Sequence, residues 1–306
     1  MKKGDKNGPI SEITPTERHD KLASAVGLKM LYLKREDLHP YESHKGRSIP
    51  YMIDFGAKNG AKSFAISSSG NAALAAALHV KKIGGSDPLK MTLDIFIGQH
   101  ANPHKVEKLE ALEDEAIRVI MKERPLQSLI LAEQDGVTSL RQSTNDLALE
   151  GYISLAEEIV ETIKSSGEKS GAVFIGSSSG TTAQALAQYF TKNNLPIQVH
   201  IVQTTSCHPL ADAFDPHDIP DEKSIADAIV DQTAHRKDAL IPLIQKTGGE
   251  GWVVTNEEIE IAQKVVSDNA DVDLSTNGVL GIAGAMQATY TGHKFDGPVV
   301  CVVGGE

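Results

Sequence analysis

Short apolar segments rich in β-branched residues alternate with helical patterns along most of this 306-residue chain. In an alternation of this kind each helix carries the chain back across the sheet, so consecutive strands run parallel. The sequence therefore predicts an α/β fold with largely parallel sheets, flanking helices, and ligands at the carboxyl ends of the strands. The expected strands are Leu31–Leu33, Phe64–Ile66, Leu93–Ile97, Val119–Met121, Ala172–Ile175, Val199–Val202, Trp252–Val254 and Val299–Val303, and the expected helices cover residues 71–82, 103–114, 151–165, 181–192, 256–268 and 279–290.

The charge balance limits the partners of the chain. Its formal net charge is −11, and an acidic surface repels both nucleic-acid backbones and anionic membranes, so neither is expected as a partner. No run of 18 apolar residues is present, which argues against a membrane span. Cys207 and Cys301 are too few for a disulfide framework and lie in no metal-binding motif. We expect a cytoplasmic protein without a metal site.

A glycine-rich segment, Gly176–Thr181, follows one expected strand and leads into an expected helix. Small residues let the backbone approach a ligand closely, and the first N–H groups of a helix have no intrahelical partner, so such a turn suits a phosphate. A side chain at Gly180 is then expected to obstruct the ligand. The segment has neither the lysine of a P-loop nor the glycine spacing of a dinucleotide-binding turn. An ordinary strand-to-helix turn of small residues remains an alternative.

Two further segments upstream carry chemistry. Ser67–Asn71 forms a second strand-to-helix turn of small residues with an amide at its tip, which suggests a ligand with two anionic groups. Lys45 lies in the loop segment Ser43–Arg47, beside His44. Most lysines are solvated surface residues, but a lysine amine near a buried site attacks carbonyl groups. Two unrelated turns and a surface lysine are the plain alternatives.

These three segments, in this order, resemble the fold-type-II pyridoxal-phosphate enzymes, the family of the tryptophan synthase β subunit, threonine synthase, threonine dehydratase and cysteine synthase. The resemblance covers nearly the whole chain and implies that Lys45 carries pyridoxal 5′-phosphate as a Schiff base. It implies that the second turn binds the substrate carboxylate, with Asn71 also near the cofactor's 3′-oxygen, and that the glycine-rich segment and His44 hold the phosphate. A histidine at a helix start without a ligand is the alternative for His44. The implied cofactor-binding residues are His44, Asn71, Gly176, Ser177, Ser178, Ser179, Gly180 and Thr181, and the implied substrate-binding residues are Ser68, Ser69, Gly70 and Asn71.

The same resemblance implies the domain organisation. Two α/β domains, each with an open and mostly parallel sheet, are expected to hold the cofactor between them. Residues 1–47 and 150–306 are assigned to a larger cofactor-binding domain, and residues 48–149 to a smaller, mobile one. A homodimer is common in this family and is the assembly to consider, although the sequence itself does not show the oligomeric state.

One position departs from the family's pattern. A Ser or Thr near the end of the last strand faces the pyridine nitrogen in that family, but this sequence has Val303 there. Valine has no hydrogen-bonding group, so Ser275 or Thr276 is needed as a substitute, or the nitrogen meets only water.

The implied reaction is β- or γ-elimination or replacement on an amino acid. The surroundings of Lys45 and Arg141 are nearest to threonine synthase, which makes O-phosphohomoserine the first substrate to consider. A serine or threonine dehydratase, or a sulfhydrase-type lyase, is the alternative. Val303 also leaves open a protein that binds the cofactor but is catalytically impaired.

Overall fold

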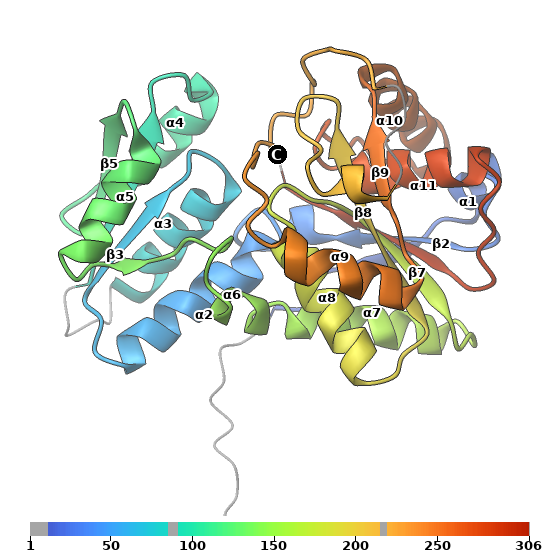
Figure 1. Cartoon of the computed structure of the whole chain (residues 1–306), viewed down its shortest axis with the longest axis horizontal. Helices are drawn as coiled ribbons and strands as arrows, with labels where there is room; N and C mark the ends of the chain where they lie inside the picture. Colours follow the sequence, from blue (N-terminus) through green and yellow to red (C-terminus); the bar gives the residue numbers. More distant parts are fainter. Residues whose placement is uncertain (1–11, 85–90, 215–218, 306) are drawn as a thin grey trace, which may run out of the picture. The chain divides into compact units, whose positions relative to one another are not determined.

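The computed structural model describes residues 12–84, 91–214 and 219–305, and Figure 1 shows it as α-helices packed on β-sheets. The described chain divides into two compact units. The smaller unit contains His39–Arg141, and the larger unit contains Thr14–Leu38 together with the chain from Gln142 onward. Each unit is an α/β layer structure with one open sheet, which confirms the predicted fold class.

The smaller unit has a four-stranded sheet in the order β5-β4-β3-β6, in which every pair of neighbours is parallel. Its buried strands Phe64–Ile66 and Leu93–Ile97 form the centre, as their apolar sequences predict. The strands are β3 (Ser63–Ser67), β4 (Thr92–Gly98), β5 (Ile117–Lys122) and β6 (Thr138–Ser139), and the helices are α2 (Lys45–Lys58), α3 (Asn71–Gly84), α4 (Pro103–Glu110) and α5 (Pro125–Gln134).

The larger unit has a six-stranded sheet in the order β1-β2-β10-β7-β8-β9. β1 is antiparallel to β2 and every other pair is parallel. The strands are β1 (Thr16–Arg18), β2 (Leu31–Arg35), β7 (Gly171–Gly176), β8 (Ile197–Thr204), β9 (Gly251–Val254) and β10 (Val299–Val303). The helices are α1 (Asp20–Ala25), α6 (Leu147–Glu150), α7 (Ile153–Ser165), α8 (Thr181–Lys192), α9 (Lys237–Thr247), α10 (Asn256–Ala270) and α11 (Leu280–Tyr290).

Strand β10 separates two apolar cores in the larger unit, because successive side chains of a strand point to opposite faces. Val299, Cys301 and Val303 pack with residues of α1, α10 and α11, whereas Val300 and Val302 pack with residues of α7, α8 and α9. Val302 of β10 is in register with Ile175 of β7, so these parallel strands end at the same edge of the sheet. The glycine-rich segment that follows β7 therefore begins at that edge.

The structure refines several expectations. Helix α8 has the bounds predicted from the sequence, whereas α4 ends earlier than residue 114, and α1, α5, α6, α9, β1 and β6 were not predicted. Lys45 is the first residue of α2 rather than part of a loop. The smaller unit includes Ile13 and His39–Arg141, so Lys45 lies in it, and the predicted smaller domain comprised residues 48–149. Helix α2 packs on α3 of this unit, where His79 binds Asp54.

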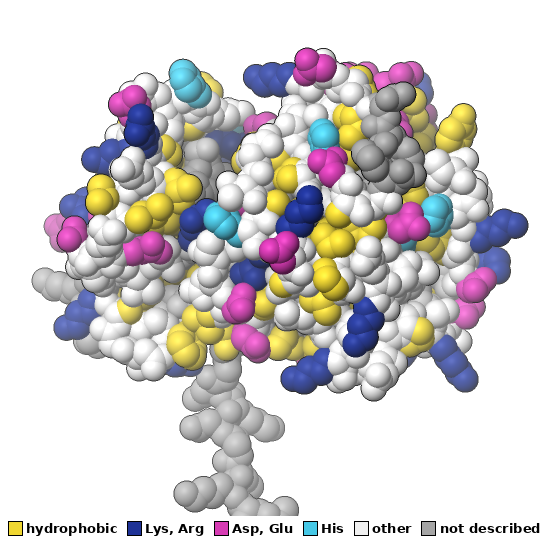
Figure 2. All heavy atoms as spheres, viewed as in Figure 1, with side chains coloured by type: hydrophobic (Ala, Val, Ile, Leu, Met, Phe, Trp, Pro, Cys, Tyr) yellow, Lys and Arg dark blue, Asp and Glu magenta, His cyan; other side chains and the backbone are white. Residues whose placement is uncertain are grey.

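One face of the molecule carries side chains of both charge signs. Figure 2 shows basic and acidic side chains interspersed over the face in view, over both units. Among the described helices, none combines the length and the apolarity that a membrane crossing requires. The described residues also contain no cluster of three or more histidine, cysteine or acidic side chains arranged to hold a metal ion.

Candidate active site

Lys45 begins helix α2, with His44 in the N-cap position. The Lys45 backbone N–H donates to the hydroxyl of Ser43, which is fully buried, so the start of the helix is anchored in the interior. A Cβ added at Gly46 would overlap the ring of His39, and it would lie 2.7 Å from Cβ of Tyr41. Only glycine fits directly after Lys45, and the Lys45 backbone is thereby held against the preceding loop.

The imidazole of His44 is a neutral group at neutral pH. Burial, followed by the positive charges or partial charges of Lys45, His39 and Arg47, holds the pKa of His44 well below its ordinary value. A neutral imidazole both donates and accepts hydrogen bonds, whereas an imidazolium only donates. His44 therefore supplies hydrogen bonds rather than charge beside Lys45.

The second predicted turn connects β3 to α3 in the same unit as Lys45. Asn71 is the first residue of α3, and the hydroxyl of Ser68 accepts a hydrogen bond from the backbone N–H of Gly70 at 3.2 Å. A Cβ added at Gly70 would meet no atom within 4 Å, so this side of the turn is open. Ser68, Ser69 and Asn71 are partly buried, which suits a turn that receives a small ligand.

The glycine-rich segment connects β7 to α8 in the other unit. Gly180 is the N-cap of α8 and has a left-handed backbone with φ of +78°, which side-chain-bearing residues rarely adopt. A Cβ at Gly180 would lie 2.5 Å from Cδ2 of Leu240 and 3.0 Å from Cδ1 of Leu210. The expectation that a side chain here would fill ligand space is thus wrong. It would collide with buried leucines, because the left-handed backbone turns this Cβ toward the core.

Two serines of the segment have structural partners. The Ser177 backbone N–H donates to the Val202 carbonyl at 2.8 Å, and its hydroxyl donates to the Ile175 carbonyl at 3.2 Å. The hydroxyl of Ser178 accepts from the backbone N–H groups of Val230 and Asp231 at 3.0 and 3.1 Å. The groups of the glycine-rich segment that remain for an anion are therefore the backbone N–H groups at the start of α8 and the hydroxyls of Ser179 and Thr181.

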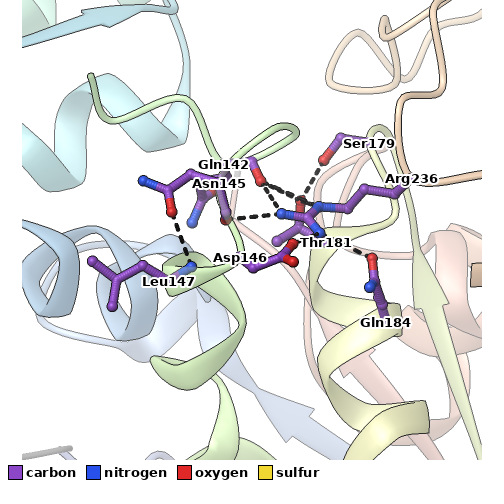
Figure 3. Close-up of polar contacts among 8 residues, drawn as sticks. All are labelled: Gln142, Asn145, Asp146, Leu147, Ser179, Thr181, Gln184 and Arg236. Atoms are coloured by element: carbon purple, nitrogen blue, oxygen red, sulfur yellow. Dashed lines mark hydrogen bonds and ion pairs between the residues drawn. The ribbon is translucent and has the colours of Figure 1, made fainter. Parts of the chain in front are cut away.

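Those last hydroxyls form a pair. Ser179 Oγ and Thr181 Oγ1 lie 2.9 Å apart, and Thr181 also contacts the side chain of Arg236 (Figure 3). Helix α8 is long enough for its dipole to favour a negative charge at this end. The donors present fit a phosphate group, and the Lys45 amine has the chemistry to bind a carbonyl carbon.

The end of β10 offers no hydroxyl. Val303 is fully buried in the apolar cluster that includes Val279 and Leu280. Of the two substitutes considered from the sequence, Thr276 donates its hydroxyl to the Ile225 carbonyl at 3.1 Å. Ser275 Oγ accepts from the Gly278 backbone N–H at 3.0 Å and retains its own proton for another acceptor. Of the two hydroxyls, only that of Ser275 keeps a proton that these hydrogen bonds do not use.

Sequence reasoning missed four polar residues around these segments. Tyr41, His79 and Asp54 form a hydrogen-bonded chain beside Lys45, and Arg236 binds the start of α8. Their partners lie 25 to 94 residues away in the sequence, so no local motif reveals them.

Comparison with known proteins identifies the family. The family model described as "Pyridoxal-phosphate dependent enzyme" matches residues 10–305. A threonine synthase of Methanosarcina acetivorans is 25% identical over 95% of this chain and 74% of its own length, and a serine dehydratase-like protein of Mus musculus is 25% identical over 72% of this chain and 66% of its own length.

Solved structures share the fold. A pyridoxal 5′-phosphate-dependent aspartate racemase superposes with a TM-score of 0.76 at 19% identity, covering 96% of this chain and 90% of that one. The threonine deaminase isoform 2 of Solanum lycopersicum superposes with a TM-score of 0.72 at 22% identity, covering 96% of this chain and 84% of that one. These structures show the shared fold, and the match of the family model over residues 10–305 establishes that the chain belongs to the family of pyridoxal-phosphate dependent enzymes.

Proposed function

We propose that this protein holds pyridoxal 5′-phosphate on Lys45 and catalyses β- or γ-elimination or replacement on an amino acid. The observation that supports it best is the position of Lys45 at the anchored start of α2, in a chain whose family is defined by this cofactor. When bound, the cofactor supplies an electron sink for the α-carbon of the substrate.

The protein's own residues take distinct parts in this proposal. The amine of Lys45 binds the cofactor and, once released by the incoming substrate, removes the α-proton. The N–H groups at the start of α8, with the hydroxyls of Ser179 and Thr181, bind the phosphate. Neutral His44 adds a hydrogen bond to the phosphate without adding charge.

The turn before α3 is assigned to the substrate carboxylate. Its backbone N–H groups and the amide of Asn71 are donors, and the hydroxyl of Ser68 keeps a proton to donate while it accepts from Gly70. An amino acid presents its carboxylate and its amine on the same carbon. Binding of the carboxylate therefore determines how the α-carbon faces the Lys45 amine.

O-Phosphohomoserine is the proposed substrate: phosphate leaves from its γ-carbon and water adds at its β-carbon, which gives threonine and inorganic phosphate. The similarity to a threonine synthase over 95% of the chain supports this choice. A serine or threonine dehydratase is the second candidate, supported by the similarity to the serine dehydratase-like protein. A chain that binds the cofactor with little turnover is the third, since buried Val303 offers no hydrogen bond at the end of β10.

A product assay distinguishes these candidates. The protein loaded with cofactor is incubated separately with O-phosphohomoserine, L-serine and L-threonine, and inorganic phosphate, threonine and 2-oxo acids are measured. We expect stoichiometric phosphate and threonine from O-phosphohomoserine. A 2-oxo acid from serine or threonine, without phosphate release from O-phosphohomoserine, would support the dehydratase instead. No product from any of them, with Lys45→Ala as the blank, would support the impaired protein.

A further inference from the structure

Arg236 is a buried cation attached to the glycine-rich segment of the larger unit. It directly precedes α9, and only 4% of its surface is exposed. Its Nε donates to Thr181 Oγ1 at 3.1 Å and to the Gln142 carbonyl at 3.2 Å, as Figure 3 shows. The guanidinium therefore binds the first residue of α8, where the proposed phosphate site begins.

The remaining partners of Arg236 in the described chain include one carboxylate and several neutral oxygens. Nη2 donates to the carbonyls of Gln142 and Asn145 at 2.6 and 2.9 Å, and Nη1 donates to Gln184 Oε1 at 3.0 Å. Of its acceptors in the described chain, only Asp146 carries a negative charge, at 2.9 Å from Nη1, and the Asp146 side chain is 84% exposed. Water screens an exposed carboxylate strongly, so the buried guanidinium keeps a positive field at the start of α8.

The hydrogen bond from Arg236 also determines where the neighbouring hydroxyl protons point. Thr181 Oγ1 accepts from Arg236, so its own proton must reach another acceptor. The Gln142 carbonyl is 3.4 Å away and already accepts two bonds from Arg236, whereas Ser179 Oγ is 2.9 Å away. Thr181 therefore donates to Ser179, and the proton of Ser179 is left to donate to a third group.

We propose that Arg236 is a positioning residue that prepares this segment for a doubly charged phosphate. Its hydrogen bond to Thr181 makes Thr181 donate to Ser179, and this relay leaves the Ser179 hydroxyl as a donor to the phosphate. Its positive field favours the phosphate dianion over the monoanion. This inference rests on the proposed function, in which the segment binds the cofactor phosphate.

The test compares pyridoxal 5′-phosphate with pyridoxal, which has the same ring and aldehyde but no phosphate. We expect Arg236→Gln to weaken binding of the phosphorylated cofactor by at least about tenfold and to leave binding of pyridoxal unchanged. The affinity of Arg236→Lys for pyridoxal 5′-phosphate should lie between those of the wild type and Arg236→Gln, because lysine keeps the charge but lacks the planar guanidinium. Arg118→Gln is the matched control, since Arg118 is an exposed arginine paired with Asp94 and should leave both affinities unchanged.

Two further measurements separate positioning from folding. The ³¹P resonance of the bound cofactor should report a dianion to a lower pH in the wild type than in Arg236→Gln, which a purely structural role would not produce. Thr181→Val breaks the relay while Arg236 stays, and should weaken the phosphorylated cofactor more than Thr181→Ser does. Unchanged affinity and an unchanged ³¹P titration in folded Arg236→Gln would overturn the inference but leave the proposed function standing. A wild-type protein that binds neither compound would overturn both.

Discussion

Tyr41 and His79 are joined by a hydrogen bond of 2.9 Å between the phenol oxygen and Nδ1, and His79 Nε2 lies 2.8 Å from Oδ1 of Asp54. When Asp54 is ionised and the imidazole is neutral, Nε2 donates to Asp54 and Nδ1 accepts from the phenol. Burial raises the pKa of Tyr41, which keeps the phenol protonated for this role. Asp54 belongs to α2 and His79 to α3, so these two hydrogen bonds attach the loop before Lys45 to both helices.

Removing members of the hydrogen-bonded series Tyr41–His79–Asp54 should lower the stability of the protein in steps. Tyr41→Phe loses one hydrogen bond, and we expect it to lower the free energy of unfolding by about 1 kcal/mol. His79→Phe leaves the groups of Tyr41 and Asp54 without their partner and should lower it by about 2–3 kcal/mol. Urea denaturation measures both. Tyr290→Phe, at a tyrosine that is 93% exposed, is the control, and losses no larger than the control's would show that the chain does not contribute.

The backbone of Gly180 predicts a strong response to a small substitution. Gly180→Ala forces a left-handed conformation on alanine and brings its Cβ against Leu240, so we expect a loss of about 1–3 kcal/mol. Gly70→Ala is the matched control in the other turn, where an added Cβ meets nothing within 4 Å. Thermal or urea unfolding compares the two. Equal stability of the two variants would contradict the interpretation of the Gly180 turn.

Asn71 is predicted to contribute more to substrate binding than to retention of the cofactor, although it is also expected near the cofactor's 3′-oxygen. Asn71→Ala should keep pyridoxal 5′-phosphate bound, while its affinity for the amino acid falls by roughly tenfold, since one charge-assisted hydrogen bond is lost. Titration of the visible absorbance with the amino acid measures this affinity. Asn59→Ala is the control, because Asn59 is an exposed asparagine at the far end of α2. Wild-type affinity in Asn71→Ala would place the carboxylate elsewhere.

His200 makes the larger unit sensitive to acid. Its ring stacks on Phe174 with centroids 4.3 Å apart, and its Nδ1 accepts from the backbone N–H of Glu250 and from Nε1 of Trp252, each at 3.2 Å. Burial, followed by the nearby His293, lowers the pKa of His200 to about 3. The unfolded chain binds the extra proton near pH 6.5, so this stability is present above that value and is lost as the pH falls toward 3.

The expected slope is about 1.4 kcal/mol of unfolding free energy per pH unit within that window. Urea denaturation at several values between about pH 6 and about pH 4 measures it. His200→Phe should remove the part of the pH slope that His200 contributes. It should also lower stability at neutral pH, because it removes the acceptor for Glu250 and Trp252. His104→Phe, at an exposed histidine, should leave the slope unchanged. A wild-type slope identical to that of His200→Phe would contradict the prediction.

Local pattern accounts for much of the fold and for part of the site. The apolar strands and helix α8 follow from periodicity and from the small residues that precede the helix, and both turns were identified by composition. Helix α9 was missed because Pro242 lies inside it, where a proline normally interrupts a helix. The position of β10 between β2 and β7 and the contacts of Arg236 depend on residues distant in sequence, which no local pattern records.

The central claim is that Lys45 carries the cofactor, and borohydride reduction tests it most directly. The purified protein, loaded with pyridoxal 5′-phosphate, is reduced and digested, and the labelled peptide is identified by mass spectrometry. We predict a yellow protein with the label on Lys45 and no specific label in Lys45→Ala. A label on another lysine, such as buried Lys34 beside Glu158, or no label at all, would contradict the account.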